Sequence, residues 1–167
     1  MRRLLVVMTV TATVLALGGS AAWAQNEHFI RASGSLNNDG TLTVSFKEAG
    51  LGTNQNITYV LSADSTVTYV CVNRGGANPS ASNKTTISGP VSATGTFNSG
   101  KNGQVTASLT VSPPGPGSFS CPPGQSLEIA QVSYTNVVLT DTTNNVSISV
   151  GGTFDSGCLL PRVRGAC

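Results

Sequence analysis

Apolar and polar residues alternate along much of the chain. In residues 41–47, Leu42, Val44 and Phe46 fall on one face, and the residues between them are polar. A period of two is the pattern of a β-strand with one buried face. The same reasoning predicts strands over residues 29–36, 57–62, 67–72, 91–97, 104–112, 127–139 and 145–150, and a break near Gln131 could divide the 127–139 strand.

Turn-forming residues separate these ranges. Asp39-Gly40 suits a tight hairpin because both residues can adopt positive φ. Further turns are expected at 63–65, 98–103 and 141–144. About eight short strands without helical periodicity between them are typical of an all-β fold. We expect an antiparallel immunoglobulin-like β-sandwich, although the only tryptophan, Trp23, precedes the strands and is not the core residue that marks antibody-type domains.

The first 24 residues have the pattern of a secretory signal peptide. Two arginines precede an apolar run over residues 4–17, and a small-residue cleavage pattern, AWA, follows it. The run is shorter than the roughly 20 residues that span a bilayer. We therefore expect residues 1–24 to be removed. Residues 25–167 would form a single secreted, extracellular β-sandwich domain with a short C-terminal tail, about 156–167, and no integral membrane anchor.

The charge of the remaining chain is balanced. Seven basic and seven acidic residues are left when Arg2 and Arg3 are removed from the nine basic residues of the whole sequence. A chain with no net charge lacks the basic surface that nucleic acids require, so no nucleic-acid partner is expected. The one basic cluster, Arg162 and Arg164, is interpreted as part of a solvated tail.

Four cysteines follow the signal segment. An even number in an exported chain predicts two disulfides, and four cysteines allow three pairings. We favour Cys71–Cys121 together with Cys158–Cys167. A zinc site is not expected, because the sequence has no CxxC pair and His28 is its only histidine.

The residue types needed for catalysis are sparse. A Ser-His-Asp or Cys-His arrangement needs a histidine beside the nucleophile, and His28 lies near the expected mature N-terminus. The seven acids after residue 24 are scattered singly. We expect a protein that is not an enzyme and needs no cofactor, with a carboxylate-based hydrolase as the least favoured alternative.

Two irregular segments are candidates for binding. Residues 71–84 form the longest irregular stretch, and SPPGPGSFSCPPGQ, residues 112–125, reads as a proline-stiffened crossover within one domain. A Cys71–Cys121 bond would make residues 73–84 and 113–120 neighbours. The candidate binding rim consists of Asn73, Arg74, Asn78, Asn83, Lys84 and Phe119.

Two resemblances bear on these expectations. CVNRGGANPSASNK and SFSCPPGQSLEIAQVSYTNVVLTD resemble segments of small secreted β-sandwich proteins of actinobacteria, a group of uncharacterised function. GTLTVSFKEAGLGTNQNITY, residues 40–59, is similar in texture to the first strands of neocarzinostatin-type apoproteins. That resemblance implies an immunoglobulin-like sandwich that holds a small chromophore in a cleft, but it assigns no binding residue here.

These observations favour a secreted, noncatalytic β-sandwich that acts through surface or loop contacts. Its partner would be an extracellular protein, a glycan or a component of the cell envelope. The alternative is sequestration of a small ligand in a cleft between the sheets, lined by the eight aromatic residues that follow the signal segment.

Overall fold

The computed structural model describes residues 26–78 and 81–167, so the expected signal peptide, residues 1–24, lies outside the described residues. The regular structure consists of strands and one short 3-10 helix. In chain order these are β1 (His28–Leu36), β2 (Leu42–Ala49), β3 (Asn56–Asn73), η1 (Ala81–Asn83), β4 (Lys84–Asn98), β5 (Gln104–Val111), β6 (Gln125–Asp141), β7 (Val146–Ser149) and β8 (Phe154–Asp155). No helix in this described part is long and apolar enough to cross a membrane.

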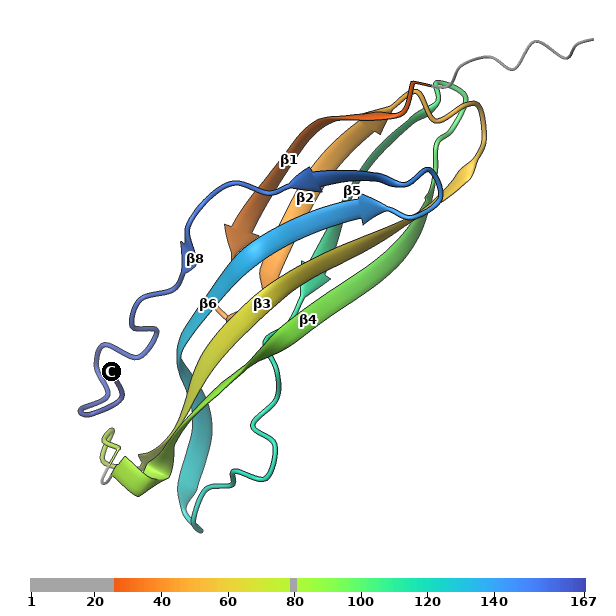
Figure 1. Cartoon of the computed structure of the whole chain (residues 1–167). Helices are drawn as coiled ribbons and strands as arrows, with labels where there is room; N and C mark the ends of the chain where they lie inside the picture. Colours follow the sequence, from red (N-terminus) through yellow and green to blue (C-terminus); the bar gives the residue numbers. More distant parts are fainter. Residues whose placement is uncertain (1–25, 79–80) are drawn as a thin grey trace, which may run out of the picture.

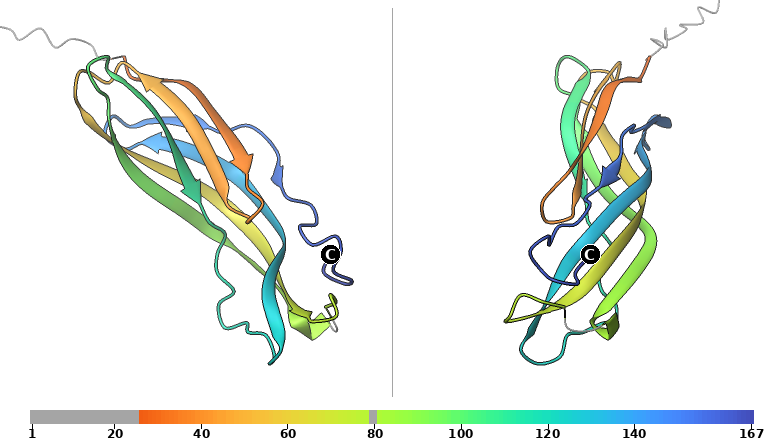
Figure 2. Two further views of the ribbon diagram at one scale, coloured as in Figure 1. Left: turned by 180° about the vertical axis from the view of Figure 1, so that it is seen from behind. Right: turned by 90° about the vertical axis from the view of Figure 1, so that its left-hand side faces the viewer.

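The strands form two antiparallel sheets that face each other (Figure 1). One sheet has the order β1-β2-β5. The other has the order β4-β3-β6-β7, and β8 also pairs with β6. The two further views show the long strands of the larger sheet running beside the smaller sheet (Figure 2). The prediction of an all-β antiparallel sandwich with about eight strands is confirmed.

The inward-facing residues of both sheets build one core. Leu42, Val44 and Phe46 of β2 are almost completely buried, as the alternation predicts. Phe46 packs across the sandwich against Tyr59 of β3, with ring centroids 4.6 Å apart. Phe29 and Phe97 pack edge-on or tilted against the same two rings. These four rings pack on one another as part of the hydrophobic core. A ligand cleft between the sheets stays a prediction.

The prediction of two strands at 57–62 and 67–72 is wrong, because residues 56–73 form one strand of 18 residues. Ala63 and Ser65, expected in a turn, are buried and continue the alternation. The irregularity lies in the neighbouring β6, where the pairing register shifts and Asn136 adopts a positive φ of 52°. Asn136 donates a hydrogen bond to Asp64 at 2.7 Å, which accommodates the outward-facing carboxylate within the strand.

In two further places the structure has strand where the sequence analysis expected irregular chain. β4 begins at Lys84 instead of residue 91, since it pairs with β3 along its whole length. The short strand β8 was not predicted, because its sequence shows no apolar alternation. Its Phe154 is buried, and the strand pairs with Ser133 and Tyr134 of β6. The crossover between β5 and β6 contains no strand, as predicted.

Candidate functional site

The two disulfides hold the segments at one end of the sandwich. Cys71, near the end of β3, is joined to Cys121 in the crossover, with Cα atoms 5.4 Å apart. Cys158 is joined to Cys167, with Cα atoms 5.9 Å apart. This is the pairing favoured from the sequence. We define the loop end as the described segments that meet there: residues 73–78, 81–84, 112–125 and 156–167.

Asn73 builds the turn that follows β3. Its side-chain oxygen accepts hydrogen bonds from the backbone N–H groups of Gly75 and Ala77, at 2.9 and 3.1 Å. Its own backbone N–H donates to the Ala77 carbonyl at 3.0 Å. Gly76 adopts a φ of 68°, a conformation that glycine takes without steric cost. The Asn73 side-chain oxygen therefore shapes the turn.

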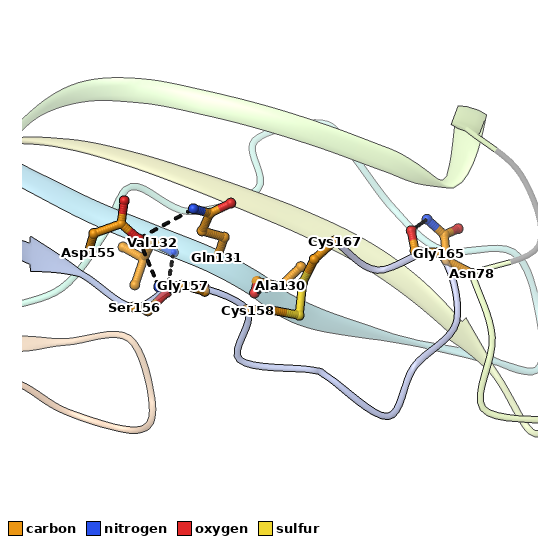
Figure 3. Close-up of a disulfide and its surroundings, with 10 residues drawn as sticks. All are labelled: Asn78, Ala130, Gln131, Val132, Asp155, Ser156, Gly157, Cys158, Gly165 and Cys167. Atoms are coloured by element: carbon orange, nitrogen blue, oxygen red, sulfur yellow. Dashed lines mark hydrogen bonds between the residues drawn. A yellow bond between two sulfur atoms is a disulfide. The ribbon is translucent and has the colours of Figure 1, made fainter.

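The backbone of the C-terminal segment pairs with this turn, while Arg162 and Arg164 are exposed to solvent, as expected of a solvated tail. Arg164 forms a parallel bridge with Ala77. The Asn78 N–H donates to the Arg164 carbonyl at 2.9 Å, and the Arg164 N–H donates to the Gly76 carbonyl at 3.3 Å. The Asn78 side-chain amide reaches the Gly165 carbonyl at 3.4 Å (Figure 3). Two loops distant in sequence thus form one surface.

The other side of the C-terminal segment is attached to β6. The Leu159 N–H donates to the Ala130 carbonyl at 2.8 Å. The disulfide sulfur of Cys167 lies 3.6 Å from the same oxygen (Figure 3). Ala166 is 1% exposed and packs with Val70 and Ala130 in a second small core. Partly buried side chains of Val72, Leu160 and Val163 surround this core. Packing and hydrogen bonds, as well as the disulfide, therefore hold the segment in place.

The remaining rim residues have different surroundings. The Asn83 amide donates to the Gln125 side chain at 3.2 Å, which links the 81–84 segment to the crossover. Phe119 is partly buried and packs against the main core. Lys84 starts β4 opposite Val70. Thus three rim residues, the asparagines, hold loops together, and Arg74 and Lys84 keep side chains without a hydrogen bond or ion pair in the described part of the chain.

Three exposed arginine side chains lie on the loop end. Arg74, Arg162 and Arg164 are exposed, and within the described residues none of the three side chains forms a hydrogen bond or an ion pair. Together with Lys84 they make up four of the seven basic residues after position 24. Arg74 also lines a shallow depression of about 310 Å³ between the turn after β3 and the start of β6. Sequence reasoning placed Arg74 in the rim, but it did not join Arg162 and Arg164 to it.

A second polar group lies in the interior, away from the loop end. Glu48 of β2 is 0% exposed, and neither carboxylate oxygen has a hydrogen-bond partner of good geometry. Burial raises the pKa of Glu48 to about 7; Asp141 and Glu27 raise it further, whereas the Tyr59 hydroxyl and His28 oppose the shift. Burial and the neighbouring Glu48 also raise the pKa of Tyr59.

Asp141 is the better-satisfied member of this interior group. It is 0% exposed, and its carboxylate accepts hydrogen bonds from the Thr143 and Asn144 N–H groups and from the Asn144 side chain. Because Glu48 and Asp141 are closed to solvent, a substrate does not reach them in this structure. The alternation could have identified Glu48, which occupies the next inward position after Phe46. Among the described residues no cluster of three or more histidine, cysteine or acidic side chains could hold a metal ion.

Comparison with known proteins finds no relative of this chain. No protein-family model matches the chain, and neither the curated proteins nor the solved structures include a significant match.

Proposed function

We propose that the protein is a secreted, noncatalytic binding module whose loop end contacts an anionic extracellular partner. A carboxylate- or phosphate-bearing glycan of the cell envelope is the partner class that this surface suits best. The observation that carries the proposal is the set of three exposed arginines, Arg74, Arg162 and Arg164, without partners in the described chain. Arginine presents a planar fork of N–H donors that matches carboxylate and phosphate groups.

The way these arginines are mounted supports a binding role. The Arg164 backbone is paired with residues 76–78, and the C-terminal segment is closed by the Cys158–Cys167 bond. A surface that is ordered before binding loses less conformational entropy when it meets a partner. The disulfides also agree with an oxidising compartment, and the signal-peptide pattern of residues 1–24 supports secretion.

The strand order further supports an immunoglobulin-like sandwich. A small sheet β1-β2-β5 faces a larger sheet in which β3 and β6 are central neighbours. Sandwiches of this type often bind through loops at one end, because a rigid scaffold positions loop side chains. The loop end has that position in this chain.

Binding to immobilised polygalacturonate, with uncharged dextran as the reference surface, tests the proposal. The variant with Arg74, Arg162 and Arg164 all changed to Ala should bind about tenfold more weakly at low salt, because three charge-assisted contacts are lost. A matched variant with Arg31, Lys47 and Lys101 changed to Ala loses the same charge elsewhere and should bind within about twofold of the unchanged protein. Equal weakening by both variants would show only a net-charge effect and contradict the proposal.

A further inference from the structure

A groove beside the first part of β6 has no arginine in its lining. Its volume is about 470 Å³, and apolar side chains form much of its lining. Leu127 is one of only two large hydrophobic residues in the described chain that are notably exposed, at 38%. The lining comprises Asn38, Asp39, Tyr69, Leu127, Glu128, Ile129, Leu159 and Leu160.

The groove follows an open edge of the larger sheet. Leu127, Glu128 and Ile129 are consecutive, and successive strand residues point to opposite faces, so a groove that all three line runs along the strand edge. On the side away from β3, β6 is paired from Ala130 to its C-terminal end. Its partners there are β7, β8 and the backbone N–H groups of residues 156 and 159. No described residue continues this pairing past Ala130 toward the start of β6.

The groove also carries uncompensated negative charge. Asp39 Oδ1 accepts hydrogen bonds from the Thr41 N–H and hydroxyl at 3.0 and 2.7 Å, and these bonds hold the pKa of Asp39 below its usual value. Glu128 is exposed, and its side chain makes no hydrogen bond or ion pair within the described residues. No basic side chain lines the groove. A fitting occupant therefore combines apolar and cationic groups.

We infer that the open edge of β6 binds an extended peptide segment in which an apolar side chain lies next to lysine or arginine. The peptide backbone would add to the sheet beside residues 127–129, as in other cases of strand addition. Its apolar side chain would cover Leu127 and Leu160, and its cationic groups would face Asp39 and Glu128. This second binding surface carries acidic side chains and no basic ones, and it shares the C-terminal segment, through Leu159 and Leu160, with the arginine surface.

Fluorescence anisotropy with a labelled peptide, Ac-TKVKVT-NH2, tests this inference on the disulfide-bonded protein. The peptide should bind measurably at low salt, and Ac-TEVEVT-NH2 should bind at least about tenfold more weakly, because it places carboxylates against Asp39 and Glu128. A protein variant with Asp39→Asn and Glu128→Gln should bind the lysine peptide about tenfold more weakly. A control variant with Glu27→Gln and Asp64→Asn loses the same charge outside the groove and should bind within about twofold of the unchanged protein.

Two probes separate strand addition from simple amphiphile binding. A lysine peptide methylated on alternate backbone nitrogens should lose most of its binding, because it cannot complete a strand ladder. Octylamine should compete poorly, because it offers no backbone. Full retention by the methylated peptide, equal competition by octylamine, or absence of binding by Ac-TKVKVT-NH2 would each overturn the inference.

Discussion

Phe154 of β8 lies directly against Gly34 of β1, and this contact connects the two sheets at an open side of the sandwich. A β-carbon built at residue 34 would lie 2.6 Å from the Phe154 ring Cζ atom. Phe154 is 7% exposed and belongs to the main core. The absence of a side chain at residue 34 therefore creates the space that the Phe154 ring fills.

Replacing Gly34 with Ala should destabilise the protein by roughly 1–3 kcal/mol, because the new methyl group forces the Phe154 ring or the backbone to move. Urea unfolding monitored by circular dichroism measures this change. Gly89→Ala is the matched control, since nothing lies within 4 Å of a β-carbon there and its φ is not in the left-handed region. The control should leave stability within about 0.5 kcal/mol or raise it slightly. Equal stability of the two variants would contradict the packing argument.

The two disulfides should contribute unequally to stability. Cys71–Cys121 spans a sequence separation of 50 and Cys158–Cys167 a separation of 9. Loop-closure entropy predicts losses of about 4 kcal/mol for the Cys71→Ala, Cys121→Ala pair and about 2.5 kcal/mol for the Cys158→Ala, Cys167→Ala pair. Denaturant unfolding of both double variants measures the difference. The reverse order would mean that the C-terminal segment stabilises the fold by more than chain closure.

Burial of Ala166 should hold the C-terminal segment against the turn after β3. Ala166→Asp places an unpaired carboxylate in the small core with Val70 and Ala130, which is unfavourable. Hydrogen exchange of the Leu159 and Asn78 amides should become faster by about tenfold or more, because both bond across this contact. Arg162→Asp, at an exposed position, is the control and should leave both exchange rates nearly unchanged. Unchanged protection in Ala166→Asp would show that the disulfide alone orders the segment.

Local pattern was sufficient for the sandwich and for much of its core. The alternation of Leu42, Val44 and Phe46 identifies an inward face because a half-buried strand has a period of two. The same pattern could not show that β3 continues through Asp64. That continuity depends on Asn136, which is 72 residues away and whose positive φ accompanies the register shift in β6.

The candidate site was less accessible to sequence reasoning, because it is assembled from distant segments. The segments that carry Arg74 and Arg164 meet through backbone pairing of residues 76–78 with the C-terminal segment, and no local periodicity in the sequence predicts such pairing. Asn73 and Asn78 are polar loop residues of a kind that often binds partners, but here their side-chain amides form hydrogen bonds with neighbouring backbone groups. Composition alone does not separate a polar side chain that contacts a partner from one that builds a turn.

Glu48 should make the protein less stable as the pH rises from about 4.5 to about 7. The ordinary pKa of this carboxyl is 4.5, whereas burial raises its pKa in the folded protein to about 7. Between these values the folded state binds more protons than the unfolded state, so stability falls as pH rises and levels off above pH 7. Tyr59 of β3, Asp141 of β6, and Glu27 with His28 at the start of the described chain are the titratable groups that act on Glu48.

Glu48→Gln removes the buried charge and keeps the side-chain size, so it should abolish most of this decline. The difference in unfolding free energy between Glu48→Gln and the unchanged protein should shift in favour of the variant by on the order of 2–3 kcal/mol between pH 4.5 and pH 8. The reason is that each unit of pKa shift corresponds to about 1.4 kcal/mol. Urea unfolding across pH 4.5–8 measures both curves. Asp39→Asn is the control: the Thr41 hydrogen bonds lower the pKa of Asp39 from 3.8, so its effect on stability changes with pH only below about pH 4.5, and this variant should keep the decline of the unchanged protein across pH 4.5–8. Parallel curves for Glu48→Gln and the unchanged protein would show that Glu48 does not cause the pH dependence.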